Sequence, residues 1–181
     1  GSLDTGDFKV LYPPALGGPG GLTQLTAAQN LARRSGVIEA LAEALNQVVA
    51  LPRDIPVQIS PCADVNAWWD GKQITICSGF IGTLDFVFRD HFGFDAAEGD
   101  KQAMEATGFF FLHEVGHALI DVHQIAFTGN EEDVADQLAT LLMIGSPPGE
   151  NAIVSGANSF TGLSALQGNV SERRFWDEHS F

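Results

Sequence analysis

The chain has 181 residues, of which 45% are apolar and 18% charged, and its formal net charge is −14. These values are typical of a globular chain with one core, so we expect a single domain over residues 1–181. The negative charge argues against nucleic acid as a partner, because phosphate binding needs clustered Lys and Arg. No apolar run is long enough to insert into a membrane.

The chain begins with strand and helix signals. Gly1-Ser2 is typical of a cloning scar, and residues 8–12 predict a short strand that ends at Pro13-Pro14. From residue 23 to about residue 50 apolar side chains recur at helical spacing, which predicts a long amphipathic helix with a kink or break at Gly36. A second strand is expected over 57–60.

A hairpin is expected over residues 66–77, with a two-residue turn at Asp70-Gly71. In that register Cys77 lies opposite Asp64, and Cys62 lies one pair further along on the same face, where a bulge would bring the cysteines together. A Cys62–Cys77 disulfide would contribute about 3 kcal/mol of stability. The alternative is two buried free thiols. A disulfide favours an exported protein, so we expect a periplasmic or secreted chain whose signal peptide is absent here.

The second half of the chain predicts helices. Ser78 is a candidate cap, and the expected helical ranges are 78 to about 91, 100 to 121 or 123, 131 to about 144, and 152–166. Pro147-Pro148 is expected to close the third of these. Strands first and helices after, without regular βαβ alternation, predict an α+β fold.

The sequence His113-Glu-Val-Gly-His117 carries the chemistry. Residues four apart on a helix lie about 40° apart around its axis, so the two imidazoles can face one metal ion. Glu114 then projects beside the pair, where it can reach an activated water without being a ligand. The neighbouring residues are uncharged, which predicts a buried helix. Gly116 costs helix stability and so indicates close packing at this point.

A catalytic zinc site needs a third protein ligand. His123 has the spacing of the metzincins, but that pattern places Gly where this chain has Ile120, a β-branched residue unsuited to an abrupt left-handed turn. If the helix continues, His123 lies about 240° around from His117 and faces away.

The other candidate lies in the acidic run after residue 130. Glu132 and Asp136 are four apart and share a helix face, so Glu132 can ligate the metal while Asp136 accepts a hydrogen bond from a ligating His. The simpler explanation of an acidic run here is a favourable interaction with the helix dipole. We assign only that role to Glu131 and Asp133.

These two motifs resemble those of the gluzincins, thermolysin-like metallopeptidases whose third ligand is a Glu in an ExxxD element. More closely, the chain resembles a bacterial family of small single-domain metallopeptidases of unknown substrate. The segments that carry this resemblance are Phe8–Tyr12, Leu51–Pro56, Asn66-Ala67, Ile74–Cys77, His113–Asp121, Glu131–Gln137 and Trp176–Ser180.

The resemblance implies a zincin-like fold, with a small antiparallel or mixed sheet, an active-site helix and a following helix that bears the third ligand to one Zn2+. It also implies that residues 66–69 form a sheet edge, where Asn66, Ala67 and Trp68 bind extended peptide. The alternative for Trp68 and Trp69 is ordinary packing on both faces of the hairpin.

The expected reaction is hydrolysis of a peptide bond, with Glu114 as general base. His179 is the first candidate for an oxyanion donor, followed by Arg173, Arg174 and Tyr12. Three alternatives remain: an inert zinc-binding module, a metzincin that uses His123, and a hydrolase acting on a non-peptide amide.

Overall fold

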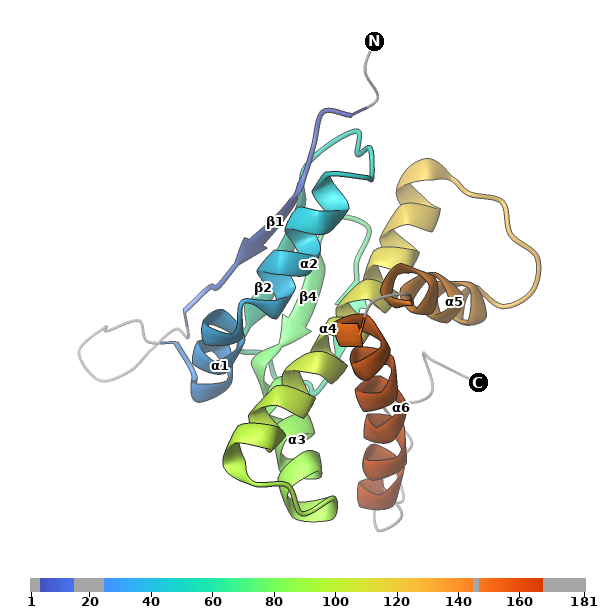
Figure 1. Ribbon diagram of the computed structural model, residues 1–181. Coiled ribbons are helices and arrows are strands. Elements are labelled where there is room, and N and C mark those ends of the chain that lie inside the picture. The colour runs from blue at the N-terminus through green and yellow to red at the C-terminus, as the bar shows by residue number, and fades with distance from the viewer. Residues whose placement is uncertain (1–3, 15–24, 145–146, 168–181) are drawn as a thin grey trace.

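The computed structural model describes residues 4–14, 25–144 and 147–167 (Figure 1). Within these ranges the elements are β1 (Phe8–Leu11), α1 (Ala27–Ser35), α2 (Val37–Asn46), β2 (Ile55–Ser60), β3 (Ala67–Trp69), β4 (Ile74–Cys77), α3 (Ser78–Phe86), the π-helical turn η1 (Val87–His91), α4 (Ala96–His123), α5 (Glu131–Met143) and α6 (Pro147–Gln167). A sheet precedes a long helical half, so the predicted α+β class is confirmed.

The sheet is mixed, with the strand order β1-β2-β4-β3. β2 lies parallel to both β1 and β4, whereas β3 is antiparallel to β4. The link from β1 to β2 runs through α1 and α2, which is one helical crossover between parallel strands. β1 and β3 are therefore the two edges of the sheet.

The long helix expected near the N-terminus is broken at Gly36, as predicted. α1 ends at Ser35, α2 begins at Val37, and Gly36 between them has a φ of 65°. Only Gly adopts this left-handed conformation without a steric cost. Thr26 starts α1 with a capping box, in which its side chain accepts from the Gln29 backbone. The break lets two short helices follow the curvature of the core.

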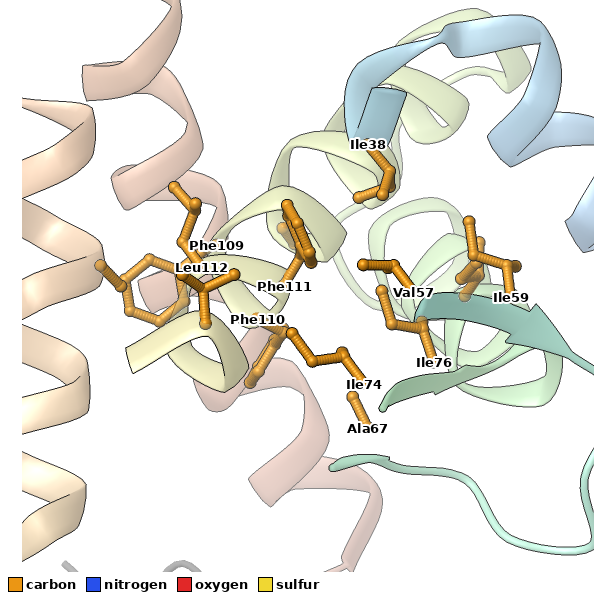
Figure 2. Close-up of a cluster of buried hydrophobic side chains, with 14 of the residues drawn as sticks. Ile38, Val57, Ile59, Ala67, Ile74, Ile76, Phe109, Phe110, Phe111 and Leu112 are labelled. Atoms are coloured by element: carbon orange, nitrogen blue, oxygen red, sulfur yellow. The ribbon is translucent and has the colours of Figure 1, made fainter. Parts of the chain in front are cut away.

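One face of the sheet is covered by helices. Alternate residues of β2, namely Ile55, Val57 and Ile59, are fully buried, and the intervening ones are half-buried. Phe111 of α4 and Ile38 of α2, both fully buried, belong to the same core cluster (Figure 2). Burial of this apolar surface is the main force that holds α4 against the sheet, directly before the two histidines.

The hairpin turn differs from the predicted one. Asp70 pairs with Gln73, so the two turn residues are Gly71 and Lys72, and the Asp70 carboxylate accepts from both Lys72 N and Gln73 N. Gly71 takes a φ of 85°. The predicted register is therefore wrong: Cys77 lies opposite Asn66 and donates its backbone N–H to Asn66 O. Because the Asp70 side chain accepts hydrogen bonds from the backbone of the turn, the turn residues lie one position later than expected.

The disulfide between Cys62 and Cys77 is present, with a Cα–Cα distance of 5.4 Å. It arises through a different neighbour than the hairpin register suggested. Ser60 at the end of β2 pairs with Cys77 at the end of β4, and Cys62 follows two residues later. The bond therefore ties two parallel strands together at their carboxyl ends, and it favours an exported protein.

Several helix ends differ from expectation. α4 begins at Ala96 because the Asp95 side chain accepts from Ala97 N and Glu98 N. α3 begins at Ser78, but no side-chain cap is made there. Pro147 opens α6, whereas we expected it to close α5. Although α4 has 28 residues, neither it nor another described helix is apolar enough to cross a bilayer.

Replacing the disulfide with Cys62→Ser and Cys77→Ala should lower the free energy of unfolding by about 3 kcal/mol, because the bond closes a loop with a sequence separation of 15. Urea unfolding followed by circular dichroism measures this difference. The reduced wild type is the control and should match the double variant. Equal unfolding midpoints for oxidised wild type and variant would contradict the prediction.

Candidate metal centre

The second half of α4 is buried around His113, and His117 one turn further along is half-buried. His113 is 6% exposed and Glu114 2%, and all residues from 106 to 112 are buried. The run of Phe109, Phe110 and Phe111 packs the helix on the sheet and on α6, where Phe160 contacts both Phe109 and Phe110. The predicted burial of this helix is therefore confirmed.

Three side chains that could ligate a metal converge between α4 and α5. The Nε2 atoms of His113 and His117 are 3.1 Å apart. The two carboxylate oxygens of Glu132 lie 3.1 Å from His113 Nε2 and 3.4 Å from His117 Nε2. Tetrahedral zinc with bonds of 2.0–2.1 Å holds its ligand atoms about 3.4 Å apart. The group can therefore hold a metal ion with little change in geometry.

Each imidazole also has a carboxylate at its outer nitrogen. His113 Nδ1 lies 2.7 Å from Asp136 Oδ1, and His117 Nδ1 lies 2.8 Å from Glu131 Oε1. In the neutral rings Nδ1 donates to these carboxylates, which leaves the Nε2 lone pairs directed at the shared point. Asp136 has the contact that we expected for it. The interpretation of Glu131 as a helix-dipole residue alone is incomplete.

The electrostatics of His113 reflect its mixed surroundings. Burial disfavours the charged imidazolium and by itself lowers the pKa. The hydrogen bond with Asp136 and the charges of Glu114, Asp136 and Glu132 together outweigh burial, so the pKa of His113 is raised above its ordinary value. The carboxylates around His113 therefore favour a positive charge at this position, which a bound cation would provide.

α5 approaches α4 very closely at Gly116. A Cβ added to Gly116 would lie 2.9 Å from Ala135 Cα and 3.1 Å from Ala135 Cβ, so only glycine fits here. Asn130 starts α5 by accepting from Glu132 N. The close approach that Gly116 indicated is confirmed, and it brings the first turns of α5 alongside both histidines.

His123 is not part of the group. α4 continues without interruption through Ile120 to His123, which is exposed, and the left-handed residue comes only at Gln124. The group of described residues that can hold a metal contains Glu132 as its third member. The geometry therefore favours the glutamate and not the metzincin alternative.

β3 is an edge strand, as the family resemblance implied for residues 66–69. Because Cys77 N bonds Asn66 O and Asp70 N bonds Gln73 O, the alternation of an antiparallel ladder directs the backbone groups of Ala67 and Trp69 away from β4. The Asn66 side chain accepts from Ala67 N. Trp68 is half-buried on the side of the sheet opposite to Ala67.

One link between this edge and α4 was not predicted from the sequence. Trp69 Nε1 donates to Asp121 Oδ2 over 2.9 Å, and the Arg53 guanidinium lies 5.7 Å from the Trp69 ring centroid. Trp69 is thus a structural residue that joins the sheet edge to the end of the helix carrying the histidines. Because Asp121 lies 52 residues after Trp69, no local pattern in the sequence predicts this hydrogen bond.

The oxyanion candidates are placed only in part. His179, Arg173 and Arg174 lie outside the described residues. Tyr12 follows β1, at the opposite edge of the sheet from β3, and its hydroxyl donates to Glu39 Oε1 over 2.7 Å. Burial and this glutamate raise the pKa of Tyr12 far above its usual value. Tyr12 is therefore a packing residue and not part of the metal centre.

Comparison with protein families gives one match. The family described as “Putative metallopeptidase” matches residues 21–181. No curated protein and no solved structure matches the chain significantly. The matched range includes every residue of the candidate centre.

Gly116→Ala should destabilise the protein by about 1–3 kcal/mol, because the added methyl group overlaps the backbone of α5. Gly82→Ala in α3 is the matched control: nothing lies within 4 Å of its new methyl group, so it should be neutral or stabilising by up to about 1 kcal/mol. Thermal and urea unfolding of both variants measure the difference. Similar unfolding curves for the two variants would show that α4 and α5 are not in close contact.

Proposed function

Because the chain belongs to the “Putative metallopeptidase” family, we propose that it is a zinc-dependent peptidase with His113, His117 and Glu132 as ligands to one Zn2+. The observation that carries the proposal is the convergence of these three side chains within 4.8 Å of one another. Two imidazoles and one carboxylate form a ligand set of catalytic zinc sites, which leave a further position for water or substrate. We further propose a single zincin-like domain, exported from a bacterium.

The chemistry follows from what each side chain can do. A zinc ion in this set would polarise the substrate carbonyl and make water more acidic. Glu114, adjacent to the first ligand on α4, takes the proton from the attacking water and delivers it to the leaving amine. Asp136 holds the His113 ring by accepting from Nδ1. His179 is proposed as the donor that stabilises the oxyanion.

An extended peptide is the proposed substrate, bound at the edge of β3. The outward N–H and C=O groups of Ala67 and Trp69 can form a short antiparallel or parallel ladder with it. Asn66 already accepts from Ala67 N and is positioned to exchange that bond for one to the peptide. Trp68 offers apolar surface beside the strand. The hydrogen bond from Trp69 to Asp121 holds this edge in a fixed position relative to α4.

A buried Glu114 distinguishes this proposal from an inert zinc-binding module. Glu114 is 2% exposed, directly after His113 on α4, and zinc binding by His113, His117 and Glu132 does not require it. A hydrolase uses a carboxylate beside the metal as general base, whereas a purely structural zinc site needs only its ligands.

Glu114→Gln should keep stoichiometric zinc and lower turnover by about 10²–10⁴-fold, because the amide cannot accept the proton from water. Elemental analysis measures the metal, and mass spectrometry of a broad peptide library measures cleavage. Glu43→Gln, an exposed residue of α2, is the matched control and should behave like the wild type. Full activity in Glu114→Gln would contradict the mechanism. A zinc-loaded wild type that cleaves no peptide would instead support the binding module.

A further inference from the structure

The candidate centre has an orienting carboxylate on both of its histidines. Glu131 Oε1 lies 2.8 Å from His117 Nδ1, a contact equivalent to the 2.7 Å contact between Asp136 and His113. The His117 side chain is only 12% exposed, whereas that of Glu131 is 43% exposed. The glutamate thus reaches from the surface of α5 to the buried ring, and it closes the outer side of the histidine.

The helix dipole does not account for this contact. Glu131, Glu132 and Asp133 all lie in the first turn of α5, where any acid interacts favourably with the N-terminus. Their side chains nevertheless have different surroundings. Glu132 faces both Nε2 atoms and Glu131 faces one Nδ1 atom, whereas Asp133 is exposed and has no contact with either imidazole. Three successive acids therefore differ in geometry while sharing the dipole.

We propose that Glu131 is a positioning residue that orients His117 for metal binding, in an inference that rests on the proposed zinc site. By accepting from Nδ1–H it selects the tautomer whose Nε2 lone pair faces the ion, and it fixes the rotation of the ring. Its negative charge also makes the imidazole more basic, so that Nε2 is a stronger electron-pair donor to the metal ion. Glu131 and Asp136 thus flank the ligand Glu132 on one helix, and each holds one of the two histidines.

The consequence concerns how the centre is assembled. α5 supplies the third ligand and both orienting groups, so one rigid helix sets the positions of the Glu131, Glu132 and Asp136 carboxylates. A rotation of α5 would lose all of these contacts together. The close packing of Gly116 on Ala135 opposes that rotation.

The test compares zinc affinity in Glu131→Ala, Asp136→Ala and Asp133→Ala by competition with a chelator. We expect Glu131→Ala to weaken binding by about 10–100-fold, as Asp136→Ala should. Asp133→Ala should change it by no more than about fivefold, the limit set by an exposed helix-dipole contact. Glu131→Gln keeps an acceptor oxygen and should recover most of the loss.

A second readout separates positioning from a merely structural role. In the Co2+-loaded protein, Glu131→Ala should shift the visible absorption bands because the His117 ligand is reoriented, and Asp133→Ala should leave them unchanged. The metal-free variants should unfold at similar temperatures. Equal zinc affinities for Glu131→Ala and Asp133→Ala, or no recovery in Glu131→Gln, would overturn the inference. A wild type that binds no zinc would instead overturn the proposed function.

Discussion

The close contact of α4 and α5 at Gly116 and Ala135 is the constraint on which the candidate centre depends. The donor atoms come from two helices, and the contacts between them span only 2.7–3.4 Å. Such contacts survive only if the helix axes approach closely and stay there. A Cβ at position 116 would lie 2.9 Å from Ala135 Cα, so α5 would have to shift away from α4 and the contacts between the carboxylates and the imidazoles would lengthen.

The same region shows how a polar cluster is accommodated in an apolar helix. His113 and Glu114 follow directly after the buried run from Phe109 to Leu112, where an uncompensated charge would be costly. α5 pairs the polar ring atoms, because both nitrogens of each histidine face a carboxylate, and these carboxylates leave the cluster with an excess of negative charge. The raised pKa of His113 records this excess of negative charge. A divalent cation would complete the balance, so the geometry of the cluster and its electrostatics lead to the same conclusion.

Features with a local cause could be predicted from the sequence. The break at Gly36, the burial of the helix around His113 and the close approach at Gly116 each follow from one residue type in one environment. The predicted register of the hairpin is wrong because the Asp70 side chain accepts hydrogen bonds from the backbone of the turn and so determines where the turn lies. The spacing of residues along the chain does not reveal this interaction. The disulfide was predicted correctly, but the strand pairing that brings the two cysteines together was not. The parallel pairing of β2 with β4 is a long-range property of the fold. The contact of Glu131 with His117 could not be predicted for a related reason. Its neighbours share the helix dipole, and only the packing of α5 against α4 shows which acid contacts His117.

α4 relates the two halves of the proposed active site to each other. Asp121 lies four residues after His117, about one helical turn further along, and it holds Trp69 at the end of the β3 edge. The two histidines proposed as ligands and the strand proposed to bind peptide are therefore attached to adjacent turns of one rigid helix, α4. Sites built on rigid elements keep their geometry better than sites built on loops. One helix and one side-chain hydrogen bond thus connect His113 and His117 to the edge strand β3, and only Glu132 depends on the loop between α4 and α5 for its position.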